Sequence, residues 1–221
     1  MSTVNLTVSV DFWGPYACFT NPLTKAERRS YDVPTPSAAR GMLDSIYVKP
    51  EEFYWSVRKI EVLRPIRRIS CKRNEVKVKT TGVRPIDVEQ AHTPRTSVLL
   101  KDVKYRVTAA IVPKYDDLAF AMQLYEQMVR RLRSGQCFKQ PYLGMREFVA
   151  MFAPSDFREK PILDSRDFGP MLFDTHIPGN CTKGFSGADI SVYHCVMRHG
   201  VIIVPPYDSL DVAKTGRLEH V

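Results

Sequence analysis

One short stretch combines residue types that can hold a nucleic-acid backbone. GQCFKQPYLGMREF, residues 135–148 and here called the glycine loop, carries two glycines, three aromatic rings and two cations. Six of these residues are candidates for binding: Gly135, Phe138, Lys139, Tyr142, Gly144 and Arg146. Glycines let backbone N–H groups approach a phosphate, and aromatic rings can stack on a base. An ordinary helix-to-strand connection whose aromatics complete the core has the same composition, and the spacing alone favours that simpler reading.

Cations also gather in one other segment. The chain has 32 Lys and Arg against 24 Asp and Glu, a formal net charge of +8 at pH 7, which suggests a polyanionic partner. Eight cations lie between residues 64 and 84 with Glu75 as the acid among them: Arg64, Arg67, Arg68, Lys72, Arg73, Lys77, Lys79 and Arg84. A solvated surface hairpin would explain such a run. Because like charges repel one another when no anion is near, we instead expect phosphate contacts, with Arg67, Arg68, Lys72, Arg73, Lys77 and Lys79 as candidates.

Histidine and cysteine are spaced in one region like the ligands of a metal ion. His176, Cys181, His194 and His199 imitate a four-ligand zinc site. Strand periodicity would turn His194 and His199 to opposite faces, so we expect no metal. His92, beside the basic segment, could act as an acid or a base, although an exposed loop histidine is the simpler reading.

Length and composition place the chain in a broad class. Its 221 residues, 44% of them hydrophobic, can form one generous domain or a domain with a small second lobe. Five scattered cysteines indicate reduced thiols and a cytoplasmic protein. The polar start MSTVNLTVSVDF is not typical of a signal peptide, and no apolar run is long enough to cross a membrane.

Hydrophobic periodicity predicts the elements that position these residues. The predicted elements are a strand over 3–10, a helix from Pro36 that Pro50 stops, a strand over 53–62 with a bulge at 58–59, a long strand over 96–112, a helix over 116–134 and a strand over 146–152. The second helix should bury Leu118, Ala121, Met122, Tyr125, Met128, Val129 and Leu132. Gly41, inside the first helix, costs roughly 1 kcal/mol relative to Ala, so we expect a close neighbour there.

This order of elements predicts an α+β fold of the ferredoxin-like kind, in which an antiparallel sheet carries two helices on one face. The other face would be open, as in domains that lay single-stranded RNA across a sheet. We expect this domain over residues 1–152, with the basic insertion at about 64–95 as a projecting hairpin. Residues 153–221 should form a small β-rich region with short strands at 171–175, 190–196 and 201–204, the last two joined at His199 and Gly200.

Several stretches resemble one RNA-binding family. The glycine loop, which follows a helix that ends in arginines, resembles the loop of the repeat-associated mysterious proteins of CRISPR systems. Within that superfamily the chain is most similar to the Cas-five subunit of type I-C systems. The similar stretches are DFWGPYACFTNPLTKAERRSYDVPTPSAARGMLDSIYVKP at 11–50, IEVLRPIRRISCKRNEV at 60–76 and TSVLLKDVKYRV at 96–107.

The resemblance implies a specific activity. In that family the subunit cuts the CRISPR repeat transcript without a metal or other cofactor, through attack of a ribose 2′-hydroxyl on the adjacent phosphate. It then stays on the 5′ handle of the CRISPR RNA inside a Cascade surveillance complex. The implied partners are the CRISPR RNA, the Cascade large subunit and the backbone subunits, with target DNA met only through the complex and no membrane.

The resemblance also implies a catalytic residue. Tyr47 matches the family's tyrosine at the end of the first helix, although a core aromatic that continues the stripe of Leu43 would look the same. The family's adjacent Lys-His pair is not matched, because Gln123 and Leu124 stand there and Lys114-Tyr115 lies most of three turns away. Two functions therefore stay open: an endoribonuclease, or a non-catalytic subunit that caps the handle after another nuclease has cut. A generic RNA chaperone is a third reading.

Overall fold

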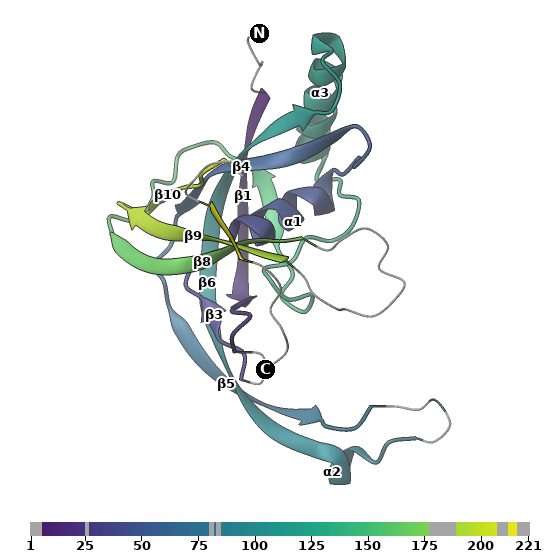
Figure 1. The fold of residues 1–221 in the computed structure, drawn as a ribbon, viewed down its shortest axis with the longest axis vertical. Coiled ribbons are helices and arrows are strands. Elements are labelled where there is room, and N and C mark those ends of the chain that lie inside the picture. The colour runs from purple at the N-terminus through teal and green to yellow at the C-terminus, as the bar shows by residue number, and fades with distance from the viewer. Residues whose placement is uncertain are drawn as a thin grey trace.

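A nine-stranded antiparallel sheet runs through the part of the chain that the structure, a computed structural model, describes: residues 6–24, 27–79, 82, 85–176, 189–206 and 212–215. Its strands are β1 (Leu6–Ala17), β4 (Phe53–Val62), β5 (Arg68–Val76), β6 (His92–Pro113), β7 (Met151–Pro154), β8 (Arg166–His176), β9 (Asp189–Arg198), β10 (Val201–Ile203) and β11 (Val212–Thr215). The order is β11-β9-β10-β4-β6-β1-β7, with β5 paired to β6 and β8 to β9. The fold is α+β, a curled sheet with few helices (Figure 1).

Two helices pack against the sheet, and both begin as their capping residues predict. In α1 (Pro36–Ile46) the Thr35 hydroxyl accepts the Ala38 N–H at 3.1 Å, and Pro36 occupies the first turn. In α3 (Leu118–Ser134) Asp117 is the N-cap and Gly135, with φ 66°, ends the helix in the left-handed conformation. α1 contacts β4 and β8, whereas α3 contacts β1, β6 and β7. A short helix, α2 (Val88–Ala91), and a small two-stranded sheet, β2 (Phe19–Thr20) with β3 (Ser30–Tyr31), complete the fold.

The sheet face that we expected to be open is covered. Asp11 on β1, Arg106 on β6 and Glu61 on β4 are direct cross-strand neighbours on this face. Arg106 is 2% exposed, and its Nε lies 3.0 Å from an Asp11 oxygen. The segment 155–162 closes over it, because Arg106 Nη2 donates to the Glu159 carbonyl at 3.0 Å and the Phe157 ring lies 4.7 Å from the guanidinium carbon. The expectation that RNA lies across an open sheet is therefore wrong at the centre of this face.

Several predicted boundaries were also wrong, each for a tertiary reason. β1 continues through Gly14 to Ala17, because it stays paired with β6 as far as Leu100. The strand expected over 146–152 is reduced to Met151–Pro154, since turns occupy the preceding residues. α3 is rotated relative to the prediction: Leu124 is buried, while Leu118 and Met122 are 57% and 40% exposed.

Other expectations are confirmed. The register of β4 against β6 shifts between Val57 and Lys59, at the predicted bulge. The turn between β9 and β10 has positive φ at His199 and Gly200, the conformation of a two-residue hairpin turn. β10 also pairs with β4, so these strands extend the same sheet. Within the described part of the chain, no helix is both long and apolar enough to span a bilayer.

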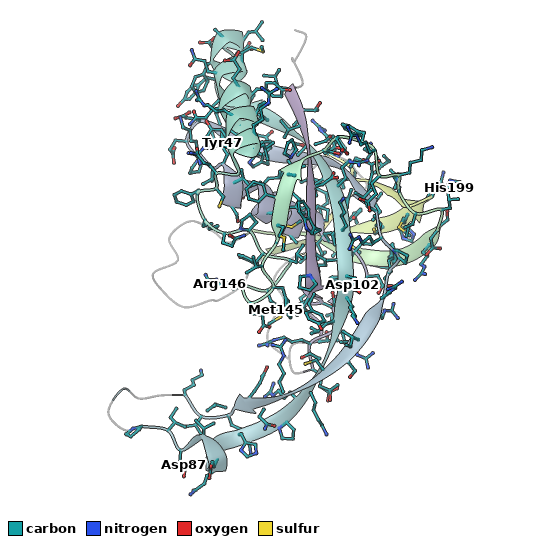
Figure 2. All side chains as sticks on the ribbon, turned by 180° about the vertical axis from the view of Figure 1, so that it is seen from behind. Tyr47, Asp87, Asp102, Met145, Arg146 and His199 are labelled. Atoms are coloured by element: carbon teal, nitrogen blue, oxygen red, sulfur yellow. The ribbon has the colours of Figure 1, made fainter. Side chains whose placement is uncertain are left out.

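The basic segment forms a projecting hairpin, as expected. β5 pairs with the first part of β6, from Arg68 opposite Leu100 to Val76 opposite His92. β6 has 22 residues and starts earlier than predicted, so one strand runs from the hairpin into the body. Asp102, with φ 52°, lies between the part of β6 that pairs with β5 and the part that pairs with β4 (Figure 2). Here β5 and residues 77–100 are called the basic hairpin (Figure 1).

We predict that Arg106→Met destabilises the protein by about 3–5 kcal/mol, because it removes the buried cation between the Asp11 and Glu61 carboxylates and leaves them only the partly exposed Lys104 and Lys59. Urea unfolding measures the change. Arg158→Met is the control, since Arg158 forms an exposed ion pair with Asp156 and should cost less than about 1 kcal/mol. Equal effects of the two changes would contradict a structural role for the buried cation.

Alkaline pH should destabilise the folded protein through its buried phenols. Burial holds the pKa of Tyr105 far above its usual value near 10, so above pH 10 the unfolded chain loses a proton that the folded chain keeps. When the pH is raised from 10 to 11, the unfolding free energy of Tyr105→Phe should therefore fall by about 1 kcal/mol less than that of wild type. Tyr115→Phe, at an exposed site, should follow wild type. Parallel pH profiles for all three proteins would refute this prediction.

Candidate functional site

The first half of the glycine loop is built onto the end of α1. The N–H groups of Phe138 and Lys139 donate to the carbonyls of Ile46 at 3.2 Å and Ser45 at 2.9 Å. These carbonyls belong to the last turn of α1 and have no partner within the helix. Two backbone N–H groups of the glycine loop are therefore engaged in capping α1 rather than free to meet a phosphate.

Gly144 permits a close approach, but the neighbour belongs to the chain itself. With φ 84°, its backbone lies so near Cys18 that an added Cβ would sit 2.0 Å from the Cys18 carbonyl oxygen. The Cys18 N–H also donates to the Leu143 carbonyl at 3.0 Å. The glycine thus locks the loop against β1 and β2, and the loop offers a ligand its side chains.

Those side chains are accessible. Phe138 is 69% exposed, and Lys139 and Arg146 are exposed as well. Tyr142 is half-buried and lines a hollow beside α1. Figure 2 shows Arg146 on the same side of the molecule as Tyr47, with His199 on the opposite side.

Two of the candidate RNA-binding cations on β5 already have carboxylate partners. Arg68 donates from Nε to Asp32 at 2.7 Å, and Arg73 donates from Nη1 to Glu147 at 2.6 Å. The repulsion inferred from the sequence is therefore reduced by acids that other elements supply. No local pattern identified these acids, because they lie 36 and 74 residues away in the sequence.

The remaining hairpin candidates keep their charge exposed. The Arg67 side chain is 64% exposed, with Asp102 at 4.0 Å. Lys72, Lys77 and Lys79 are exposed, and among the described residues none has an acidic partner within ion-pair distance. These lysines are the cations best placed to meet a polyanion.

Arg73 joins the two candidate surfaces. Besides binding Glu147, its guanidinium carbon lies 5.6 Å from the Phe148 ring centre, so it holds the end of the glycine loop against the hairpin. Further along β5, Glu75 pairs with Arg28, and Arg28 Nη1 lies 3.1 Å from Glu75 Oε1. Residues predicted separately from two distant segments thus form one surface.

Tyr47 is the C-cap of α1, and its side chain is packed. The residue is 2% exposed, and its hydroxyl donates to Gln127 Oε1 at 3.3 Å. Arg131, which the sequence did not single out, donates to the Ile46 carbonyl at 3.2 Å and lies 5.3 Å from the Tyr47 ring centre. In the sequence, only the run of arginines at the end of α3 indicated that a cation could lie beside Tyr47.

The surroundings of Tyr47 determine what its phenol can do. Burial raises the pKa of Tyr47 above its usual value near 10, which outweighs the cations nearby. At neutral pH the group is a neutral phenol, able to donate or accept a hydrogen bond but not to act as a phenolate base. Arg131 supplies positive charge beside it.

Gln123 and Leu124, which stand where the resemblance led us to expect a Lys-His pair, cannot transfer a proton. Gln123 is exposed and Leu124 is 2% exposed, in the core. The Lys114 N–H donates to the Glu52 carbonyl at 2.8 Å, which brings the start of α3 to the segment that follows Tyr47. Tyr115 is 61% exposed and meets Phe120 edge to face.

The histidines take other positions. His194 Nε2 lies 2.9 Å from Asp167 Oδ2, whereas His199 stands in the β9–β10 turn. Cys181 lies outside the described residues, and His176 ends β8. Among the residues that the structure describes, no three His, Cys, Asp or Glu are grouped to hold a metal ion. His92 Nδ1 lies 3.2 Å from the Val88 carbonyl in the hairpin.

Known proteins share this sequence and fold. The chain is 47% identical over 167 residues to the CRISPR pre-crRNA endoribonuclease Cas5d of Thermus thermophilus, covering 76% of this chain and 72% of that protein. It is 36% identical to the protein of the same name in Mannheimia succiniciproducens, over 94% of this chain and 98% of that one. A crystal structure of a CRISPR-associated protein shares the fold, with a TM-score of 0.66 at 23% identity over 94% of this chain and 96% of that chain.

A family profile matches nearly the whole chain. The Cas5d profile, which describes a CRISPR-associated protein, covers residues 7–204. This range includes α1, the basic hairpin, the glycine loop and the strands β8 to β10. The chain therefore belongs to the Cas5d family of CRISPR-associated proteins.

Proposed function

We propose that this chain is a pre-crRNA endoribonuclease that cuts the repeat transcript of a type I-C CRISPR system and keeps the 5′ handle inside a Cascade complex. The observation that carries the proposal is the 47% identity to an endoribonuclease of that name over 76% of the chain. The protein would act in the cytoplasm beside the Cascade large and backbone subunits, and meet target DNA only through the complex.

The arrangement of the elements supports a ferredoxin-like reading of residues 1–152. In space the strands run β7-β1-β6-β4, and along the chain α1 falls between β1 and β4 and α3 between β6 and β7. The basic hairpin is the insertion in this arrangement, and residues 153–221 add strands at the edge of β4.

The proposed RNA surface comprises the basic hairpin and the glycine loop. Exposed lysines at 72, 77 and 79 would contact phosphates, and the exposed ring of Phe138 could stack on a base. Arg73 supports this surface because it ties the loop to the hairpin through Glu147. Arg67, Lys139 and Arg146 would add positive charge to the proposed RNA surface.

The proposed chemistry is an internal transfer at phosphorus. The ribose 2′-oxygen forms a bond to phosphorus while the bond to the 5′-oxygen breaks, and a proton passes to the leaving oxygen. The products are a 2′,3′-cyclic phosphate and a free 5′-hydroxyl, and the step needs an aligned 2′-hydroxyl and a cation at the phosphorane. Tyr47 as a neutral phenol would align the 2′-hydroxyl, and Arg131 or Lys139 would supply the cation.

A second candidate function has an observation of its own. Tyr47 is 2% exposed with its hydroxyl bonded to Gln127, and neither Gln123 nor Leu124 can transfer a proton. A subunit that only caps the handle needs no such group. In that case the basic hairpin and the glycine loop would bind RNA that another nuclease has cut.

Cleavage of the cognate repeat hairpin in the presence of EDTA distinguishes the two functions. If Tyr47 aligns the nucleophile, Tyr47→Phe should lower the single-turnover rate by about a hundredfold, because misplacement of a reacting group by about 1 Å can cost that much. Tyr115→Phe is the matched control and should cut like wild type. Tight binding without cleavage by wild type would establish the capping function.

The charge of the hairpin predicts how binding depends on salt. Replacement of Lys72, Lys77 and Lys79 by Gln should weaken repeat binding and reduce the slope of log K against log salt by about two, since each lost phosphate contact removes about 0.7. Fluorescence anisotropy between 50 and 300 mM salt would measure both. The matched control replaces Arg158, Lys160 and Arg198, exposed cations away from the hairpin. An unchanged slope in the lysine variant would remove the hairpin from the interface.

A further inference from the structure

Gly41 is unusual in α1 because no packing contact requires a glycine at this position. It is the one exposed residue between Pro36 and Ile46, all of which the structure describes. Apart from its own helix and chain neighbours, no described heavy atom lies within 4 Å of the position a Cβ would take. Glycine weakens a helix more than any residue except proline, so the sequence predicted a close neighbour here. Within the described chain that expectation is wrong.

The space above Gly41 is a hollow of about 270 Å³, here called the Gly41 hollow. α1 contributes Ser37 and Gly41, β2 contributes Phe19 and Thr20, and the glycine loop contributes Tyr142. The hollow therefore offers aromatic surface, hydroxyls that include those of Thr20 and Ser37, and one point on α1, at Gly41, where no side chain covers the helix backbone. Its volume is near the lower end for ligand pockets and suits one nucleotide-sized group rather than a nucleic-acid duplex.

The hollow lies beside the glycine loop, one of the two parts of the proposed RNA surface. The glycine loop forms one wall, and Arg73 ties this loop to the basic hairpin through Glu147. In the other direction α1 leads to Tyr47, its C-cap, and the Lys139 N–H bonds the Ser45 carbonyl next to that end. An RNA strand that contacts both the hairpin lysines and Tyr47 can run past the hollow, where Gly41 is the exposed residue of α1.

We propose that the Gly41 hollow binds one nucleotide of single-stranded RNA, with its ribose and phosphate against Gly41 and its base against the Tyr142 ring. The inference rests on the proposed RNA-binding function and assigns one subsite to it. Without a side chain at residue 41 the sugar-phosphate backbone can lie directly on the helix. Ser37 and Thr20 can donate hydrogen bonds to its oxygens, and the Tyr142 ring offers a stacking surface.

A substitution that improves the helix but fills the hollow tests this assignment. Gly41→Gln should raise the melting temperature by about 2–4 °C, because Gln is a far better helix former than Gly. The same change should weaken binding of a labelled single-stranded repeat RNA by about tenfold or more, since loss of one stacked base has that effect. Gly41→Ala should also raise the melting temperature and weaken binding less. It keeps the test valid if the Gln variant fails to fold.

Matched controls separate the hollow from general effects. Ala119→Gln adds the same side chain at an exposed position of α3 and should leave RNA affinity unchanged. Tyr142→Ala removes the ring proposed to stack on the base and should lose affinity, and Tyr142→Phe, which keeps the ring, should lose less than Tyr142→Ala. Opposite changes in stability and affinity at residue 41 would support the subsite.

The outcomes also separate this inference from the proposed function. If wild type binds no repeat RNA, the proposed function and the subsite both fail. If wild type binds and Gly41→Gln binds equally well, only the subsite is overturned. If Gly41→Gln keeps full RNA affinity but no longer assembles with its partner subunits, a protein fills the hollow and the proposal is again overturned.

Discussion

A buried guanidinium holds the sheet together. Arg106 on β6 pairs with Asp11 on β1 and lies 3.8 Å from Glu61 on β4, so one side chain links three strands. Lys59 lies 3.1 Å from Glu61, and Lys104 lies 4.0 Å from Asp11, so cations and carboxylates alternate across the face. Charges this deeply buried are tolerated only when they are paired and hydrogen-bonded. The segment 155–162 therefore keeps the buried Arg106 hydrogen-bonded, in addition to completing the fold.

Because that face of the sheet is covered at its centre, the surface accessible to a ligand lies elsewhere. Single-stranded RNA commonly lies on the open side of sheets of this kind, but here the centre of that side is occupied by Phe157 and its neighbours. The exposed cations proposed to contact RNA stand instead on the basic hairpin and the glycine loop. The loop caps α1, approaches Cys18 through Gly144 and binds Arg73 through Glu147, so three separate segments give the surface one rigid support.

Local chemistry predicted the local features well. Thr35 and Pro36 indicated where α1 begins, Gly135 where α3 ends, and the change of phase near residue 58 indicated the bulge in β4. Features decided by distant partners were missed. Nothing near Arg68 or Arg73 revealed that Asp32 and Glu147 would pair with them, and α3 is rotated because the sheet selects Leu124 over Met122. For the candidate site, the sequence found the loop and the cations, whereas the burial of Tyr47 and the role of Arg131 depend on packing between two helices.

The length of β6 restricts how this chain can change during evolution. Side chains alternate between faces on each side of Asp102, where the alternation is interrupted, so an insertion or deletion of one residue within either part would turn the later side chains of that part to the wrong face. In the body such a shift would turn Arg106 away from Asp11 and Glu61, and in the hairpin it would exchange the two faces of the ribbon. Relatives of this protein should therefore differ in length mainly at the hairpin tip, between Val76 and His92, where residues can be gained or lost without changing either register.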